Sequence, residues 1–159
     1  MAVASAFHSL ITNTIFLSTV SSLCFTQITK MVLYLVSHKN KSSREAIETA
    51  IWRTGGMPSS HSAVVCALTT STGLSEGISS NLFVFCLIFT MVVLRDALGV
   101  RRAAGLQAKA LNTLGKMTAD KIGLEFQSVK EIQGHTPLEV LVGAVLGIAI
   151  AIGFYLLDI

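Results

Sequence analysis

The sequence is poor in charged residues, and this excludes an ordinary soluble domain. Asp, Glu, Lys and Arg make up 13% of the 159 residues, whereas 52% are hydrophobic. A soluble domain typically has about a quarter of its residues charged. With two prolines and no low-complexity tract, the chain also offers no flexible linker. We therefore expect a membrane protein that forms one domain over residues 1–159.

Cysteine is also scarce, and its placement argues against redox and metal chemistry. The three cysteines, Cys24, Cys66 and Cys86, lie singly inside apolar stretches, and no C-x-x-C pair is present. Such cysteines commonly behave as small buried hydrophobic side chains. The spacing of histidine and cysteine typical of zinc sites is missing as well. We expect no metal ion and no other cofactor.

Four apolar stretches are candidates for membrane-spanning helices, each of which needs about 20 residues. They lie at about 7–36, 60–75, 80–97 and 137–157. The first, which has no basic region before it, is interpreted as a retained helix and not as a secretory signal. It forms either one tilted helix or one span followed by an interfacial turn. The second is short and rich in threonine, so other helices should shield it from lipid. The expected fold is all-α, a polytopic bundle of about four spans.

The positive charges are confined to one side of this bundle. All twelve Lys and Arg residues lie in the loops 38–57 and 99–134 or at the membrane boundary beside them. Positive loops mark the cytoplasmic side. We therefore expect an integral protein of a bacterial inner membrane, with both termini outside and both loops in the cytoplasm. The second loop should contain a helix, because Leu106, Ala110, Leu111 and Leu114 recur at helical spacing.

Two polar runs on the basic side carry the chemistry. "GGMPSSHSA" (55–63) and "GHTPLEV" (134–140) each open an apolar stretch and each contain a histidine. Helix N-termini offer unpaired N–H groups and a positive dipole end, which bind anions. Two histidines on either side of a bound phosphate suit a nucleophile and a general acid. The basic residues near these runs, which suit phosphate oxygens, are Lys30, Arg44, Arg53, Arg95, Arg101 and Arg102.

These runs resemble the divergent, bacterial- and plant-type branch of the type 2 phosphatidic acid phosphatase and vanadium haloperoxidase superfamily. "MPSSHSA" is similar to the Pro-Ser-Gly-His motif, with Pro58, Ser59 and His61 at matching places. "HTPLE" is similar to the end of the third motif, with His135 and Glu139 in H-x-x-x-E spacing. "GVRRAAG" resembles the arginine part of that motif, and "QITK" and "IWRTGG" resemble the first motif. The likeness covers nearly the whole chain.

The resemblance implies a phosphohistidine mechanism. His135 would attack phosphorus, Glu139 would hold its other ring nitrogen, and His61 would protonate the leaving oxygen. The groups that would bind the phosphoryl oxygens are Lys30, Arg53, Ser59, the backbone N–H of Ser60, and Arg101 or Arg102. The scheme requires no metal ion.

The chain departs from the superfamily pattern at several points. Ser60 replaces the motif glycine, and Glu139 replaces aspartate. About thirty residues separate Arg101 and Arg102 from His135, where the superfamily has five. The spacing between Lys30 and Arg53 is wider than usual, and six spans are common in membrane members. A homodimer is one way to replace missing helices.

Several of these residues also have purely structural interpretations. "TPLE" is a capping box in which Glu139 reaches back to Thr136, and Ser59 and Ser60 suit a helix start. Asp96 is expected to pair with a nearby arginine. Gly143 and Gly147 form a G-x-x-x-G that suits either an internal contact or a dimer seam. Gln107, Lys109 and Asn112 are expected on the solvated face of the loop helix.

Two functional hypotheses follow. The first is a membrane-embedded phosphatase that removes phosphate from a phosphomonoester or pyrophosphate lipid, such as phosphatidic acid or an isoprenoid phosphate. The second is a catalytically silent membrane protein of the same fold that binds anionic lipid headgroups or partners. Neither hypothesis involves nucleic acid. The intact histidine pair favours the first hypothesis, whereas Ser60 and the divided third motif favour the second.

Overall fold

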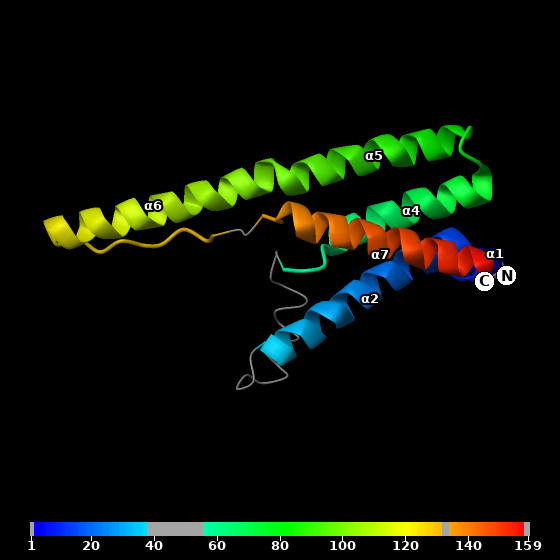
Figure 1. The fold of residues 1–159 in the computed structure, drawn as a ribbon, viewed down its shortest axis with the longest axis horizontal. Coiled ribbons are helices and arrows are strands. Elements are labelled where there is room, and N and C mark those ends of the chain that lie inside the picture. Colours follow the sequence, from blue (N-terminus) through cyan, green and yellow to red (C-terminus); the bar gives the residue numbers. More distant parts are fainter. Residues whose placement is uncertain (1, 38–55, 132–133, 158–159) are drawn as a thin grey trace.

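The protein is an all-α bundle, as the sequence predicts. The computed structural model describes residues 2–37, 56–131 and 134–157. Their helices are α1 (Ala2–Ile11), α2 (Thr14–Ser37), α4 (Ser60–Glu76), α5 (Asn81–Leu98), α6 (Val100–Ile122) and α7 (Pro137–Leu156). Within these described ranges, three segments are long and apolar enough to cross a membrane, namely α2, the α5–α6 pair and α7. Figure 1 shows α2, α4, α5 and α7 gathered into one bundle, from which α6 projects.

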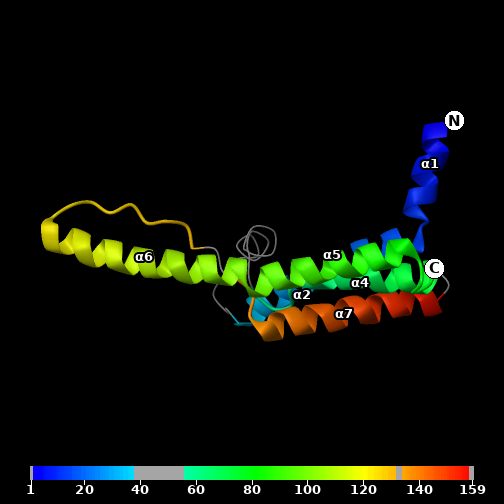
Figure 2. The same cartoon turned by 90° about the horizontal axis from the view of Figure 1, so that it is seen from above.

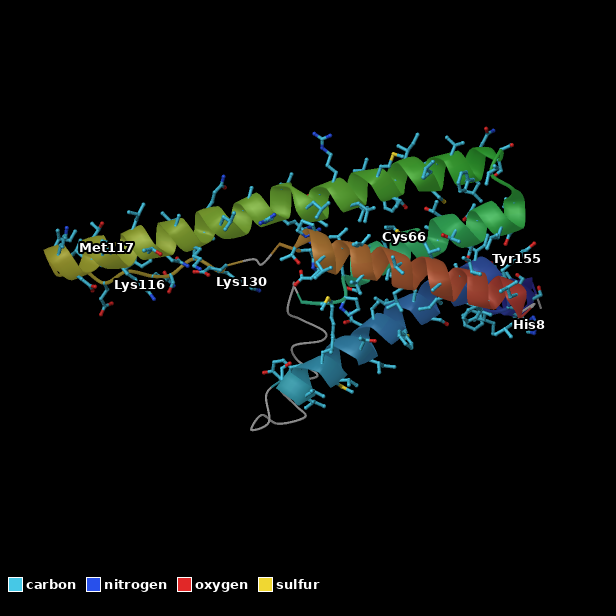
Figure 3. The ribbon with its side chains drawn as sticks, viewed as in Figure 1. His8, Cys66, Lys116, Met117, Lys130 and Tyr155 are labelled. Carbon is cyan, nitrogen blue, oxygen red and sulfur yellow. The ribbon has the colours of Figure 1, made fainter. Side chains whose placement is uncertain are left out.

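Helix α4 occupies the centre of this bundle. It has 17 residues, nine of which are buried, and it contacts α7, α2 and α5. Cys66, near its middle, lies among the other helices (Figure 3). This helix corresponds to the short, threonine-rich stretch at 60–75, whose shielding by other helices is confirmed. It is not among the three described segments that could cross a membrane by length and composition, because it is short and rich in serine and threonine.

Hydroxyl groups join α4 to its neighbours. The side chains of Ser18 in α2 and Ser71 in α4 are hydrogen-bonded to each other. The hydroxyls of Thr69 and Thr90 are 2.8 Å apart, and Thr90 also donates to the carbonyl of Val65 at 3.0 Å. In lipid, helix association depends on close packing and interhelical hydrogen bonds, because lipid tails are as apolar as the helices themselves. This explains why a membrane bundle buries so much serine and threonine.

Two glycines let α7 approach α4 closely. A Cβ atom added at Gly143 would lie 2.3 Å from the carbonyl oxygen of Ser59, and one at Gly147 would lie 2.1 Å from that of Ala63. Both glycines are buried. The G-x-x-x-G therefore serves an internal contact, which is one of the two alternatives that the sequence left open.

The first apolar stretch is divided near its beginning, which differs from both forms expected for residues 7–36. Helix α1 ends at Ile11, and Asn13 caps α2 by accepting a hydrogen bond from the backbone N–H of Phe16 at 3.0 Å. An asparagine side chain competes with helical hydrogen bonding and favours such a start. Figure 2 shows α1 turned away from the rest of the bundle.

Helix α6 and residues 123–131 form an arm outside the bundle. Gly123 ends the helix in the left-handed region, with a φ of 71°, and the chain then runs back alongside α6 (Figures 1 and 2). Asn112 accepts a hydrogen bond from the N–H of Val129 at 2.8 Å and donates to the carboxylate of Glu131 at 2.9 Å. The prediction that Asn112 lies on a solvated face was wrong, because the returning chain supplies backbone partners for its amide.

Helix α6 packs against the returning chain through Gly115 and not through its leucines. The phenyl ring of Phe126 lies where a side chain at Gly115 would be. Leu106 and Leu114 are each 63% exposed. The helix expected from the periodicity of residues 101–114 is present, but its apolar side faces outward.

Candidate functional site

The starts of α4 and α7 lie near the end of α5 at one end of the bundle (Figure 1). Helix α2 runs toward the same side but diverges from them in its last turns (Figure 1). His8 and Tyr155 mark the opposite end (Figure 3). The backbone N–H of Ser59 donates to the carbonyl of Glu139 at 3.0 Å, which joins the two helix starts. Two helix N-termini side by side present positive dipole ends and free N–H groups, so this end favours an anion.

The run before α4 is a helix cap, as one interpretation of the sequence held. The side chain of Ser59 accepts hydrogen bonds from the N–H of Ser62 at 3.4 Å and from its hydroxyl at 2.9 Å. Ser59 is fully buried and Ser60 is 7% exposed. Because Ser59 acts as acceptor in both bonds, capping does not use its own O–H group.

Glu139 performs both tasks that were considered as alternatives. Its Oε2 atom accepts a hydrogen bond from the N–H of Thr136 at 3.0 Å and lies 3.2 Å from Nδ1 of His135. Thr136 completes the capping box by accepting from the N–H of Glu139 at 3.3 Å. His135 is 5% exposed, so its ring is held on a helix start with Nδ1 engaged. The second ring nitrogen, Nε2, is left for other chemistry.

The two motif histidines lie close together. The ring centres of His61 and His135 are 6.4 Å apart, and their planes are tilted by 60°. His61 is exposed whereas His135 is buried. In a phosphoryl transfer, a nucleophile about 3–3.5 Å from phosphorus and a proton donor about 2.6–3.2 Å from a phosphate oxygen lie near the same phosphoryl group. Two rings whose centres are this close can both contact one phosphoryl group bound beside them.

Lys30 reaches this part of the site from α2. Its Nζ is 3.5 Å from the hydroxyl of Ser60, and the charge of Glu139 acts on it. One turn earlier, the amide oxygen of Gln27 is buried and is the one such side-chain atom in the described segments without a hydrogen-bond partner. The sequence showed Gln27 only as a polar interruption of an apolar stretch.

Arg101 approaches from the α5–α6 junction. Its Nε donates to Oδ2 of Asp96 at 2.6 Å, which confirms the expected pairing of Asp96 with an arginine. The charges of Arg101, Lys30 and Asp96 all act on the ring of His61. Arg53 lies outside the described residues.

The arm explains the long interval in the third motif. A Cβ atom at Gly134 would lie 2.3 Å from Cα of Arg102 and 2.8 Å from the carbonyl carbon of Arg101. The chain therefore leaves the bundle after Arg102 and returns to the same point, immediately before His135. The arginine and histidine parts of the motif are separated along the chain but adjacent in space. The signal for this in the sequence was the glycine next to His135, because a close backbone contact requires a residue without a side chain.

Gly134→Ala is expected to weaken anion binding at this end of the bundle. The added methyl group would collide with the backbone of α6, so either His135 or Arg101 must move, and we expect about a tenfold loss of affinity for inorganic phosphate or vanadate. Gly115→Ala is the matched control, because its methyl group would displace Phe126 on the arm, away from the site. Equal affinities in the two variants would contradict the close contact at Gly134.

Comparison with known proteins supports the same grouping. The model of the divergent PAP2 family matches residues 11–150. The chain is also similar to the Bacillus subtilis (strain 168) protein named "Uncharacterized membrane protein YuiD", with 36% identity over 154 residues that cover 90% of this chain and 94% of the relative. No solved structure matches the chain. With the family model covering most of its length, and with both histidine motifs in place at one end of a helical membrane bundle, the chain belongs to the divergent PAP2 family.

Proposed function

We propose that the protein hydrolyses a phosphomonoester or a pyrophosphate on a membrane lipid through a phosphohistidine. One observation carries this proposal. His135 is buried with Nδ1 held by Glu139, and its ring centre lies 6.4 Å from that of His61, next to two helix N-termini. A purely structural histidine would not need a second histidine so close to it.

The proposed reaction has two steps. Nε2 of His135 attacks phosphorus, so an N–P bond forms while the bond from phosphorus to the ester oxygen breaks. His61 donates its proton to the leaving oxygen, and Glu139 stabilises the positive charge that develops on the ring of His135. In the second step water attacks phosphorus and the N–P bond breaks. His61, now neutral, takes a proton from this water, which releases phosphate and restores both histidines.

The remaining groups act by position and charge. A transferring phosphoryl group carries charge on its three non-bridging oxygens, and most catalysis of its transfer comes from stabilising that charge. The start of α4 and Lys30 supply N–H groups and a cation on one side of the site. The groups proposed to hold the oxygens are Ser59, Ser60, Lys30, Arg53 and one of the two neighbouring arginines, Arg101 or Arg102.

The substrate is proposed to be a lipid in the cytoplasmic leaflet. The helices that carry the site are exposed and apolar along their outer faces, for example at Phe85 and Leu141, so the site lies where a bundle in the bilayer would end. The basic residues that the structure describes lie near this end or on the arm that extends from it, and we propose that it faces the cytoplasm of a bacterial inner membrane. Phosphatidic acid and an isoprenoid phosphate or pyrophosphate both present their phosphate at that depth.

A silent headgroup-binding protein is the second candidate. Ser60 stands where the superfamily has glycine, and its hydroxyl lies 3.5 Å from Lys30. This serine hydroxyl therefore occupies part of the space beside the cation. Such a site would bind phosphate without turning over.

Phosphate release distinguishes the two candidates. The protein, purified in detergent, would be mixed with micelles containing phosphatidic acid or an isoprenoid pyrophosphate, and free phosphate would be measured with time. Release that vanadate inhibits supports the phosphatase. Binding of phosphate or vanadate with no release from either lipid supports the silent protein, and neither release nor binding contradicts both.

Glu139→Gln is expected to lower kcat about 10- to 100-fold with little loss of stability. Glutamine keeps an oxygen for the N–H of Thr136, but it cannot stabilise a positive imidazole as a carboxylate does. Thr136→Ala is the matched control, because it removes the other half of the capping box. It should cost about 1 kcal/mol of stability and leave kcat nearly unchanged. If kcat falls by the same factor in both variants, and only as far as each loses stability, Glu139 acts only as a cap.

A further inference from the structure

We propose that Asp96 positions Arg101 to bind the phosphoryl group, and that Arg101 and not Arg102 is the arginine of the site. The inference rests on the proposed function, because it needs a site that binds phosphate. Asp96 lies in the last turn of α5 and Arg101 in the first turn of α6, on opposite sides of Gly99. Their hydrogen bond, from Nε to Oδ2 at 2.6 Å, therefore spans the junction of the two helices.

The geometry of this bond leaves the useful part of the guanidinium group free. A guanidinium has five N–H donors, and the bond to Asp96 uses the one on Nε. The two terminal nitrogens carry the other four. A phosphate group is gripped most strongly by donors arranged as such a fork. Holding Nε in place also removes much of the rotational freedom that Arg101 would otherwise lose when the anion binds.

The two neighbouring arginines have different positions. Arg101 is held by Asp96 at the junction of α5 and α6, and its charge acts on the ring of His61. Successive residues of a helix point about 100° apart, so the two side chains cannot face the same point. Arg102 contributes through its backbone, against which Gly134 packs. This contact does not depend on the side chain of Arg102.

Stability does not account for the ion pair. The side chains of Arg101 and Asp96 are 46% and 40% exposed, and exposed pairs typically contribute about 0–1 kcal/mol. A carboxylate beside an anion site also repels the anion. If Asp96 acted only through its charge, removing that charge would tighten phosphate binding. If Asp96 positions Arg101, its removal would weaken phosphate binding, so the two explanations predict opposite signs.

The test is the affinity of the whole protein in detergent for inorganic phosphate and for vanadate, measured by calorimetry beside the unfolding temperature. Asp96→Asn should weaken binding about tenfold and leave the unfolding temperature unchanged. Arg101→Gln should weaken it further, and Asp96→Asn should cause no additional weakening in that background. Asp96→Glu, which keeps the carboxylate, should retain part of the affinity. Arg102→Gln and Asp120→Asn, which changes an exposed acid on the arm, should stay within about twofold of the parent.

The outcomes separate this inference from the proposed function. If the parent binds neither phosphate nor vanadate, the proposed function is wrong and the inference falls with it. If the parent binds but Asp96→Asn binds as well or more tightly, positioning by Asp96 is wrong and the phosphate site stands. If Arg102→Gln weakens binding as much as Arg101→Gln, the assignment of Arg101 is wrong.

Discussion

Replacing His135 with alanine should lower phosphate release at least ~10³-fold, because it removes the atom that forms the bond to phosphorus. The ring is almost completely buried, at 5% exposure, so alanine would also leave a cavity. His135→Gln fills more of that space and cannot act as a nucleophile. Both variants should lose release to the same extent while keeping helical content and a cooperative thermal transition. Release would be measured from lipid micelles under saturating substrate.

His8→Ala is the matched control for this experiment. His8 lies in α1, at the opposite end of the bundle from His135 (Figure 3), and is exposed. Its removal should leave release unchanged. If His135→Gln retained more than about a tenth of parental release, a nucleophilic role for this ring would be contradicted.

Gly147→Ala should be the most destabilising single methyl group in α7. The added carbon would lie 2.1 Å from the carbonyl oxygen of Ala63, a distance that forces α4 and α7 apart. Overpacking of this kind typically costs about 1–3 kcal/mol. The separation would also strain the bond between Ser59 and Glu139, which joins the two helix starts. Thermal unfolding in detergent, followed by circular dichroism, would measure the loss.

Gly153→Ala makes the same chemical change in the same helix and serves as the control. Among the residues that the structure describes, no atom outside its own stretch of helix lies within 4 Å of the position that its methyl group would occupy. Alanine is the better helix former, so this variant should be as stable as the parent or up to about 1 kcal/mol more stable. Equal unfolding temperatures for the two variants would contradict the close contact between α4 and α7.

The sequence predicted the parts of the fold that depend on local chemistry. The all-α membrane bundle follows from apolar stretches of helical length, and the starts of α4 and α7 follow from their capping residues. The pairing of His135 with Glu139 was implied by the resemblance to the superfamily, and it forms because residues four apart at a helix start are neighbours in space. For Glu139, capping and orientation of His135 were treated as alternatives. One carboxylate oxygen serves both.

The parts that were missed depend on contacts between distant segments. Residues 123–131 have no periodic pattern that would show them running back along α6, and Asn112 looked like an ordinary surface residue until Val129 and Glu131 lay against it. In the sequence, the long interval between the arginines and His135 therefore suggested that the third motif was incomplete. In the structure, Gly134 lies against the backbone of Arg101 and Arg102 and brings the two parts together. The break at Asn13 was missed because one polar residue in an apolar stretch has only a local effect.

The two ends of the arm differ in their distance from the site. Its helix and returning chain connect the arginine and histidine parts of one motif, and its far end, near Lys116 and Met117, is distant from the bundle (Figure 3). Its base contacts the site, through Gly134 and the first turn of α6. Substitutions along the outer arm should therefore leave phosphate binding unchanged, whereas substitutions at its base should weaken it.

The most direct test of the central claim is to trap the phosphoryl group on the protein. The parent would be mixed with the lipid that it hydrolyses, quenched within milliseconds in alkali, which preserves phosphohistidine, and digested for mass spectrometry. The account predicts one phosphoryl group on His135 in the parent and none in His135→Gln. A protein that releases phosphate while its phosphoryl group lies on another residue, or on none, would contradict the account.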